Sequence, residues 1–363
     1  PEANLSSPAP RLLAMSRFLL VSSAVAATVA TAANIHDRKF YEEKFYEWLQ
    51  EFKSHPSVQV RDGDHFVHLL QNFANNHDLI ETHNAQNLTY TLGHNAFSHM
   101  SYEEWVEYMR FGLAKDRVHE PSDLIHEAPE DPSVLASSVD WVAAGAVTPV
   151  KNQGSCGSCW SFSATGSLEG VYKIKTGTLN SYSEQELVSC DIGKLIGNHG
   201  CNGGLMDYAF KWVKDNGGLC FESAYPYTSG TTGENGDCQS HTSCDDKSLK
   251  LTGYVDVKTN NDAALASAVA MNPTAVAIQA NQPAFQLYSS GVLTGTCGAN
   301  LDHGVLAVGY GTDPNGGDYW TIKNSWGASW GESGYIRIAR GESYNNGAGQ
   351  CGIYSGPPSY PTM

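Results

Sequence analysis

The stretch from Gln153 to Trp160 reads Gln-Gly-Ser-Cys-Gly-Ser-Cys-Trp and leads into an apolar run, 160–168, that is compatible with a helix. Small residues let a backbone approach a ligand closely. A cysteine at the start of a helix lies at the positive end of the helix dipole, which favours the thiolate, the nucleophilic form of the side chain. The second cysteine, Cys159, is therefore suited to attack a substrate. On spacing alone, a structural disulfide in a secreted protein is an equally good interpretation.

A histidine and an asparagine far downstream favour the catalytic interpretation. His303 lies in the sequence Leu-Asp-His-Gly-Val at 301–305, at the start of a strand-like run. Asn324 begins the sequence Asn-Ser-Trp-Gly. One Cys, one His and one Asn at long separations are typical of a thiol hydrolase. For His303 alone, the alternative is a hydrogen-bonded histidine of the core.

Several motifs in this order resemble the papain family of cysteine proteases, and within it the cathepsin L-type enzymes. They are residues 139–162, 183–187, 200–204 and 331–335, and the resemblance extends from Leu135 to Met363. It implies an α+β, papain-like fold of two subdomains, one mostly helical and one a β-barrel, with the active site in the cleft between them. Helical patterns followed by strand patterns along the chain predict the same division.

The resemblance also implies a role for each catalytic residue. Cys159 would be the nucleophile, and His303 would take its proton to give a thiolate–imidazolium pair. Asn324 would orient the imidazole ring, and Trp326 would shield that contact from water. The side-chain amide of Gln153 and the backbone N–H of Cys159 would bind the oxyanion of the tetrahedral intermediate.

Substrate-binding residues are implied in the same way. An extended peptide would lie along two glycines, and an apolar pocket would receive the residue two positions before the cut. The implied residues are Gly203, Gly204, Leu205, Met206, Ala277, Leu301, Asp302, Trp326 and a position near Gly356. Because the pocket residues are apolar or small, the sequence predicts a preference for Leu, Phe or Val at that substrate position.

All nine cysteines follow residue 150. Eight that pair and one that stays free fit an oxidised protein of the secretory pathway with one reactive thiol. The resemblance implies the pairs Cys156–Cys201, Cys190–Cys238 and Cys297–Cys351, whereas the pairing of Cys220 and Cys244 stays open. The spacing does not fit a zinc site, and no βαβ pattern surrounds the Cys-x-x-Cys at 156–159 to suggest a redox motif. We therefore predict no metal and no cofactor.

The formal net charge of −16 argues against nucleic acid as a partner, because phosphate binding needs a basic face. Residues 1–134 carry 19 acidic and 10 basic side chains, and residues 135–363 carry 19 and 12, so charge attraction does not join the two parts. No stretch is long and apolar enough to span a membrane. We expect a monomer that acts on protein and peptide substrates.

The sequence before Leu135 is predicted to consist of three segments. Residues 1–14 are interpreted as upstream sequence of an over-extended gene model. Residues 15–33 have a basic start, a short apolar run and an Ala-x-Ala-like exit, which predict a signal peptide. Residues 34–134 are expected to form a helical inhibitory pro-domain with an exposed linker at 121–132, and residues 135–363 the peptidase domain. A helical module without an inhibitory role is the alternative for the pro-domain.

Two long helices are predicted in the pro-domain. Apolar residues at helical spacing predict the first, namely Phe40, Phe45, Trp48, Leu49 and Phe52. The second, near 66–84, matches the later half of the family's interspersed pro-region motif at Phe73, Asn76, Ile80 and Asn84. His65 and Leu69 replace the Glu and Arg expected in the earlier half, and His99 replaces an expected Asp.

Ten of the 13 histidines lie between His36 and His126. Because an unperturbed imidazole titrates at a pKa of about 6.5, we hypothesise that protonation of pro-domain histidines, His65 and His99 in particular, loosens this domain in acid. At least half of them are expected to be solvated surface residues. In the same region, the sequence Asn-Leu-Thr at 87–89 makes Asn87 a candidate glycosylation site.

In the peptidase domain, helices are predicted near 183–190 and 205–216. Beyond Cys244, strands are predicted at 249–257, 274–280, 305–310, 319–323 and 335–339, and residues 225–246 read as a loop. Together these features predict a cysteine endopeptidase made as an acid-activated zymogen in the secretory pathway, bound for a lysosome, a vacuole or the extracellular space. Two alternatives remain: a catalytically dead binding protein of the same fold, and a peptide ligase that uses the same residues.

Overall fold

The protein is described by a computed structural model that covers residues 34–113, 119, 121–193, 197–239, 244, 246, 248–295 and 297–363. The predicted upstream sequence and signal peptide, 1–33, lie outside the described residues. The helices are α1 (Arg38–Phe52), α2 (Gly63–Asn84), α3 (Tyr102–Met109), α4 (Cys159–Thr176), α5 (Glu184–Cys190), α6 (Met206–Asn216), α7 (Ser229–Thr232), α8 (Asp262–Met271) and α9 (Pro283–Leu287). The strands are β1 (Tyr90–Leu92), β2 (Ile125–His126), β3 (Val139–Asp140), β4 (Gly253–Val257), β5 (Thr274–Ile278), β6 (Tyr288–Leu293), β7 (His303–Asp313), β8 (Gly317–Lys323), β9 (Tyr335–Ala339) and β10 (Ser359–Thr362). Short 3₁₀ turns lie at Pro132–Val134, Gly200–Asn202, Tyr344–Gly347 and Gln350–Gly352.

The first two helices form an N-terminal module, residues 34–113, together with α3 and β1. Both predicted helices are present, and each begins at an aspartate side chain that accepts a backbone N–H, Asp37 for α1 and Asp62 for α2. Their facing sides meet through aromatic rings: Phe45 and Trp48 of α1 contact Phe73 of α2 at centroid distances of 5.4 and 5.8 Å. The apolar spacing read from the sequence is therefore the packing interface between α1 and α2.

Asparagine side chains of α2 position the chain that follows it. Asn76 donates to the carbonyl oxygens of Ser98 (3.0 Å) and Met100 (2.8 Å). Asn84 donates to Leu92 O and accepts the N–H of the same residue, both at 2.9 Å. Because a buried backbone group needs a partner, these amides fix the segment that leads to β1 and α3.

The strands form one sheet in the order β1-β6-β9-β8-β7-β5-β10-β4-β2, with β3 paired to β7. The predicted barrel is therefore corrected to an open sheet, because among the described residues the two end strands, β1 and β2, do not pair with each other. Both end strands precede Leu135 in the sequence, and they cover edges of the sheet that would otherwise expose unpaired backbone groups. The α+β class and the preceding helical module are confirmed.

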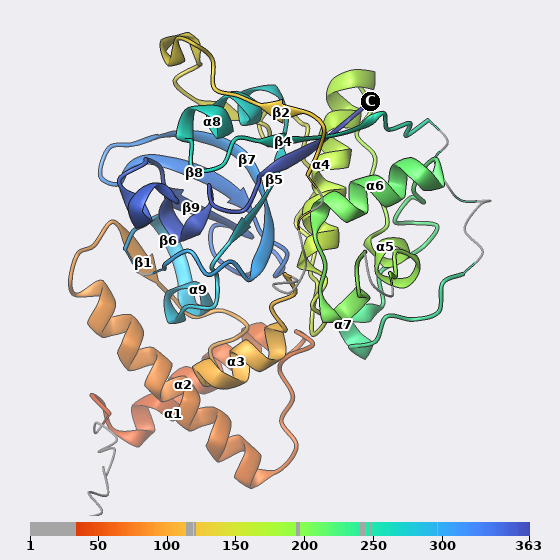
Figure 1. The fold of residues 1–363 in the computed structure, drawn as a ribbon. Coiled ribbons are helices and arrows are strands. Elements are labelled where there is room, and N and C mark those ends of the chain that lie inside the picture. Colours follow the sequence, from red (N-terminus) through yellow and green to blue (C-terminus); the bar gives the residue numbers. More distant parts are fainter. Residues whose placement is uncertain are drawn as a thin grey trace, which may run out of the picture. The chain divides into compact units, whose positions relative to one another are not determined.

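Helix α4 lies between the sheet and α5 and α6 (Figure 1). It is buried over most of its length, and Ser163 Oγ donates to the Val305 carbonyl of β7 at 2.6 Å. A helix that was not predicted, α8, lies between the strands predicted at 249–257 and 274–280. Its sequence is apolar on every side, so it carries no helical period, and Asn261 caps its first turn by accepting the Ala264 N–H.

Candidate active site

Cys159 is the first residue of α4, and its side chain is fully buried. The backbone N–H of a first helical residue has no acceptor within its own helix, so it is available to a ligand. Cys159 is the free cysteine of the chain. The other eight form the disulfides Cys156–Cys201, Cys190–Cys238, Cys220–Cys244 and Cys297–Cys351, which include the three pairs that the resemblance implied and the pair that it left open.

His303 begins β7 and contacts Asn324 at the end of β8. Its Nε2–H donates to Asn324 Oδ1 at 2.8 Å, and the Ser325 N–H donates to the same oxygen at 2.8 Å. This contact places the ring proton on Nε2 and leaves the lone pair on Nδ1. Nδ1 is buried and has no hydrogen-bond partner among the described residues. A neutral imidazole held in this way presents a base at Nδ1.

Trp326 covers the contact between His303 and Asn324. Its ring stacks on the imidazole with centroids 4.9 Å apart and planes 29° apart. Trp105 of α3 packs edge-on against Trp326 at 5.6 Å, and both indoles are fully buried. The predicted shielding residue thus lies on the ring that it was expected to protect, and the N-terminal module adds a second indole.

The thiol and the histidine meet where the first residues of α4 and β7 come together. The backbone N–H of Gly304, the residue after His303, donates to Cys159 Sγ at 3.3 Å. Two elements that are 144 positions apart in the sequence therefore bring the predicted nucleophile, base and orienting amide into one place.

Burial dominates the titration of both reactive groups. It raises the pKa of the Cys159 thiol to about 11, against the stabilising N–H groups of Gly304 and Gly112. It lowers the pKa of His303 to about 4, against the hydrogen bond to Asn324. In this covered state burial favours the neutral thiol and the neutral imidazole over the thiolate–imidazolium pair expected from the sequence. The physical reason is that protein covers both side chains, and burial disfavours either charge.

Gln153 is fully buried just before the cysteine stretch. Its Oε1 accepts the Ser325 hydroxyl at 2.6 Å, and its Nε2 donates to Cys156 O at 3.1 Å. Tyr227 OH donates to the Gln153 carbonyl at 2.9 Å and also bonds the Ser158 hydroxyl at 2.7 Å. Sequence reasoning missed Ser325 and Tyr227, because a lone hydroxyl carries no spacing signal.

A segment of the N-terminal module, residues 110–113, covers the site, and we call it the cleft segment. The Gly204 N–H donates to Gly112 O at 2.9 Å, and the Leu113 N–H donates to Asp302 O at 3.1 Å. The Phe111 ring packs edge-on against His303 at 5.8 Å. Two predicted substrate-binding residues, Gly204 and Asp302, are thus occupied by the backbone of this segment, which sequence reasoning did not identify.

The residues predicted to line the apolar pocket also lie close together in the structure. A β-carbon built on Gly356 would lie 2.5 Å from Leu301 Cδ1 and 3.6 Å from Ala277 Cβ. Met206 and Ala277 belong to one buried cluster, and Leu301 packs against it. Of the remaining predicted residues, Leu205 directly precedes α6, and Gly203 is buried, has a φ of 107° and accepts the His199 N–H at 2.9 Å.

A second contact between the part before Leu135 and the later chain was also missed. His119 Nδ1 lies 2.8 Å from Asp207 Oδ2 on α6, and its Nε2 lies 2.9 Å from Asp256 Oδ2 on β4. Both carboxylate side chains are only 7% exposed. The two aspartates hold the pKa of His119 at about 10 despite partial burial, so the ring is an imidazolium bound to two carboxylates. Nothing in the spacing of these three residues pointed to this contact.

The candidate glycosylation residue Asn87 is exposed just after α2.

Among the helices that the structure describes, none has the length and apolar character needed to cross a bilayer.

Comparison with known proteins identifies both parts of the chain. A model described as "Papain family cysteine protease" matches residues 135–361, and one described as "Cathepsin propeptide inhibitor domain (I29)" matches residues 45–105. The probable cysteine protease RD21B of Arabidopsis thaliana is 46% identical over 312 residues, which are 86% of this chain and 65% of that protein. This chain thus spans about two thirds of the length of that relative.

Solved structures of two precursors are similar over nearly the whole chain. The recombinant stem bromelain precursor has a TM-score of 0.77 and 39% identity, covering 89% of this chain and 99% of its own. The digestive procathepsin L 3 of the Tenebrio molitor larval midgut has a TM-score of 0.75 and 39% identity, with the same coverage. Both similarities include the N-terminal module.

Proposed function

The chain belongs to the papain family of cysteine proteases, and we propose that it is a cysteine-type endopeptidase made as a zymogen. One observation carries this proposal: His303 Nε2 is held by Asn324 at 2.8 Å while Nδ1 has no partner among the described residues, beside the only free thiol of the chain. This is the nucleophile, base and orienting group that thiol catalysis requires.

In the proposed reaction the Cys159 sulfur attacks the carbonyl carbon of the scissile peptide bond, and its proton passes to His303 Nδ1. The oxyanion accepts hydrogen bonds from the Cys159 N–H and the Gln153 amide. His303 then donates the proton to the leaving amine, which departs as the C–N bond breaks and a thioester remains. Water gives its proton to His303 and attacks the thioester, which releases the acid product and the thiol. Asn324 holds the ring throughout both steps.

The N-terminal module acts as the inhibitory pro-domain in this proposal. The match to a propeptide inhibitor domain supports this role. So does the cleft segment, which hydrogen-bonds to Gly204 and Asp302 and lies against His303. Removal of the segment would admit water and substrate. In a wetter site the thiolate–imidazolium pair loses the burial penalty that keeps both groups neutral.

We further propose that the pocket bounded by Gly356, Leu301 and Ala277 selects an apolar residue two positions before the cut. The short distances between these residues support this assignment, since apolar or small side chains leave a charged substrate residue without a partner. A peptide lying along Gly203 and Gly204 would bond to the protein through its backbone.

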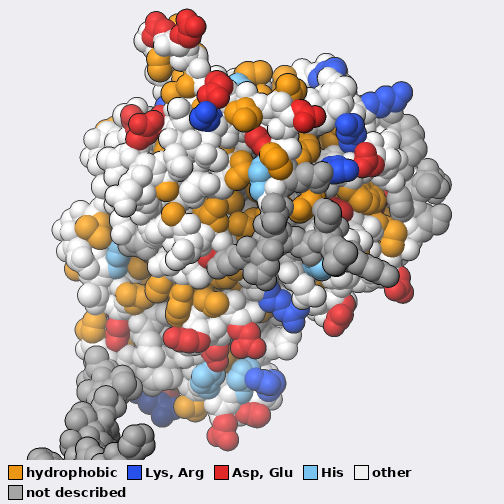
Figure 2. All heavy atoms as spheres, in the orientation of Figure 1, with side chains coloured by type: hydrophobic (Ala, Val, Ile, Leu, Met, Phe, Trp, Pro, Cys, Tyr) orange, Lys and Arg blue, Asp and Glu red, His pale blue; other side chains and the backbone are white. Residues whose placement is uncertain are grey.

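Acid is the proposed trigger of activation. In Figure 2 histidine and acidic side chains lie near one another on the pro-domain face at the bottom of the view. His99 is buried, and burial lowers its pKa to about 4, so acid forces a proton onto a group that the folded pro-domain keeps neutral. His119 binds Asp207, and burial raises the pKa of that carboxyl, so acid would neutralise it and end the ion pair. The disulfides support passage through the secretory pathway, and a lysosome, a vacuole or the extracellular space is the proposed destination.

The test is a shift of the purified precursor from pH 7 to about pH 4.5 under mild reductant, followed by mass and by hydrolysis of Phe-Arg and Leu-Arg fluorogenic peptides. Loss of the N-terminal module with the appearance of activity, neither of which occurs in Cys159→Ala, is the expected result. An intact, inactive precursor that still binds peptides would favour a binding protein of the same fold. Peptide joining in the presence of an added amine acceptor, at the expense of hydrolysis, would favour a ligase.

A further inference from the structure

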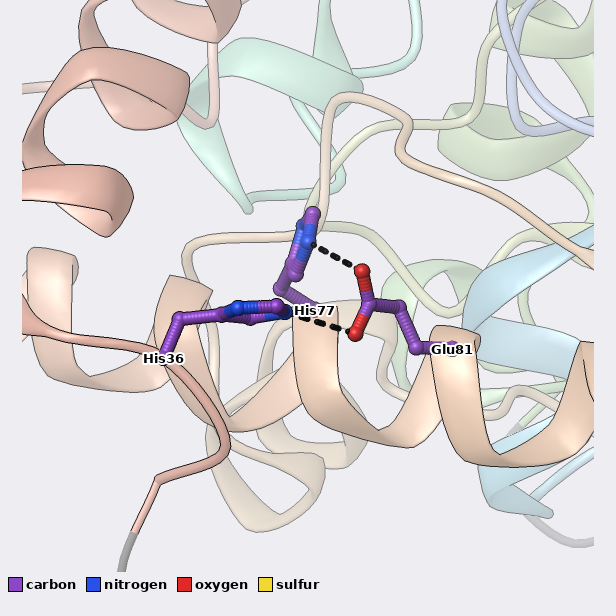
Figure 3. Close-up of side chains that lie close together, drawn as sticks. All are labelled: His36, His77 and Glu81. Atoms are coloured by element: carbon purple, nitrogen blue, oxygen red, sulfur yellow. Dashed lines mark hydrogen bonds and ion pairs between the residues drawn. The ribbon is translucent and has the colours of Figure 1, made fainter.

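Two histidines and a glutamate converge on the pro-domain, far from the catalytic residues in the sequence. His36 comes from the arm before α1, whereas His77 and Glu81 lie one turn apart on α2. His36 Nε2 lies 2.8 Å from Glu81 Oε2, and His77 Nε2 lies 3.3 Å from Glu81 Oε1 (Figure 3). One nitrogen or oxygen of each residue lies within 4.8 Å of those of the other two. The function proposed above makes no use of this cluster.

The spacing of these atoms is close to that of a metal ligand set. Zinc binds imidazole nitrogen and carboxylate oxygen at about 2.0–2.2 Å in tetrahedral sites. Two ligands of one tetrahedral zinc ion are therefore about 3.3–3.5 Å apart. Small movements of the partly exposed His36 and Glu81 side chains, 32% and 42% exposed, bring all three atoms to that spacing. The fourth position would face solvent and take a water.

The His77 ring is oriented as a metal-binding imidazole is. Its Nδ1 lies 2.9 Å from Nε2 of His94, which stacks on Phe73 with centroids 4.2 Å apart. A metal at Nε2 of His77 requires the ring proton on Nδ1, where it is donated to His94. Nε2 of His77 is buried and has no hydrogen-bond partner among the described residues. Its contact with Glu81 Oε1, at 3.3 Å, is an ion-pair contact.

The arm that carries His36 is fixed by other contacts. The Asn34 amide donates to Asp78 Oδ2 at 2.8 Å, and the His36 N–H donates to Tyr41 OH at 2.9 Å. The His36 ring packs on Phe40 with centroids 4.1 Å apart. These contacts hold the His36 side chain in place whether or not an ion is bound.

The group formed by His119, Asp207 and Asp256 is a useful contrast. Each ring nitrogen of His119 faces a different carboxylate, at 2.8 and 2.9 Å, so the ring bridges the two as a cation and turns no lone pair to a shared point. In the cluster of His36, His77 and Glu81, both rings turn a nitrogen to one carboxylate. Although both groups bring three such atoms within 4.8 Å of one another, the second arrangement suits a metal ion better.

We propose that His36, His77 and Glu81 form a zinc-binding site on the pro-domain, with His94 as the residue that orients His77. Imidazole and carboxylate ligands also accept Ni²⁺ and Cu²⁺, and Mg²⁺ prefers all-oxygen sites. A bound ion would add a further link between α2 and the arm before α1, beside the bond from Asn34 to Asp78, and would stabilise the folded pro-domain by mass action.

The experiment is a calorimetric titration of the Cys159→Ala precursor with zinc chloride at pH 7, where the reactive thiol is absent and self-cleavage is blocked. We expect one zinc ion per chain and a higher unfolding temperature with zinc. His77→Gln and Glu81→Gln should each weaken binding at least tenfold, and His94→Gln about 10- to 100-fold. His68→Gln is the matched control, since His68 lies 2.6 Å from Glu104 in a pair with only one histidine.

Because His77 packs in the module core, its replacement can affect folding, and His36→Gln on the arm gives an independent test. It should weaken zinc binding to the same degree as Glu81→Gln without lowering the unfolding temperature in the absence of zinc. Absence of zinc binding overturns the proposal, and so does zinc bound equally by these variants and by His68→Gln. None of these results depends on peptidase activity.

Discussion

Gly112 of the cleft segment lies so close to Gly157 that a β-carbon built on it would be 1.9 Å from the Gly157 carbonyl oxygen. No real β-carbon tolerates that contact, and the obstacle is backbone that cannot rotate away. A glycine at 112 therefore allows the segment to lie against the loop that precedes the catalytic helix. The same approach lets the Gly112 carbonyl accept the Gly204 N–H at 2.9 Å.

Replacement of Gly112 by alanine should weaken inhibition while leaving the pro-domain folded. The segment must move away from Gly157, which breaks its hydrogen bond to Gly204 and opens the site to water. We expect the precursor to process itself about tenfold faster near pH 6, in line with the loss of about 1.4 kcal/mol of contact. Gly63→Ala is the control, because a β-carbon at that position meets nothing within 4 Å. Equal processing rates in both variants would contradict the assigned role.

Near pH 7, His119 should bind the chain that precedes the linker to the surface of the peptidase domain, through Asp207 and Asp256. Its raised pKa of about 10 means that its stabilising charge is complete below its unfolded pKa of about 6.5 and is lost only as the pH rises toward 10. If acid weakens this ion pair, the cause must therefore be protonation of a carboxylate and not a change in the charge of His119. Burial raises the pKa of Asp207 above its usual value although His119 pulls it down, so a falling pH protonates Asp207 and ends the ion pair.

His119→Gln should thus raise the pH at which the precursor activates, by about one unit, because two buried carboxylates lose their cation. The pH midpoint of processing, followed by mass, is the measurement. His126→Gln is the matched control, since the ring nitrogens of His126 contact two hydroxyls, Tyr360 at 2.9 Å and Ser267 at 3.0 Å. A midpoint that His119→Gln leaves in place would show that this contact does not restrain the linker.

His99 should make the pro-domain less stable in acid. Its ring is 3% exposed and its Nε2 bonds the Ser57 carbonyl at 3.0 Å, while burial lowers its pKa to about 4. Between pH 6.5 and 4 the unfolded chain binds the proton more readily than the folded one, so folding free energy is lost as the pH falls. The loss reaches roughly 2–3 kcal/mol at pH 4.

His99→Gln keeps a donor for Ser57 but removes the proton uptake, so the pH midpoint of activation should fall by a few tenths of a unit or more. His65, which was paired with His99 in the hypothesis from the sequence, is partly exposed, and its Nδ1 accepts two N–H groups of Arg61, from the backbone at 3.2 Å and from Nε at 3.4 Å. His65→Gln therefore serves as the comparison and should leave the midpoint unchanged. A shift in His65→Gln alone would reverse this assignment.

Sequence reasoning succeeded where a local pattern carries the information. The apolar period at 40–52 predicted a helix that the structure contains as α1, and the second predicted helix, near 66–84, is present as α2. It failed at α8, whose sequence is apolar on all sides, and at the closure of the sheet, which depends on strand partners far apart in the chain. The roles of Gly112 and His119 could not be predicted, because they depend on contacts with residues that are distant in the sequence: Gly157 for Gly112, and Asp207 and Asp256 for His119.

Gln153 should contribute to the rate and little to binding. If its amide stabilises the oxyanion, Gln153→Ala should lower kcat about 100- to 1000-fold with KM nearly unchanged. Ser325 donates to Gln153 Oε1 at 2.6 Å and acts as a positioning residue, so Ser325→Ala should lower kcat about tenfold by releasing the amide. Steady-state kinetics of the processed enzyme would decide. An equal rise in KM with unchanged kcat would assign Gln153 to substrate binding instead.

Gly356 should set the size of the pocket for the residue two positions before the cut. A β-carbon there would lie 2.5 Å from Leu301 Cδ1, so Gly356→Ala must push the leucine into the pocket or fill that space itself. We expect kcat/KM to fall about tenfold or more for a substrate with Phe at that position and much less for one with Val, since a methylene-sized misfit costs about 1–3 kcal/mol. Gly253→Ala, whose β-carbon would lie 3.7 Å from Thr362 Oγ1, controls for a general effect of the substitution. Equal losses for both substrates would place this pocket outside the recognition of that residue.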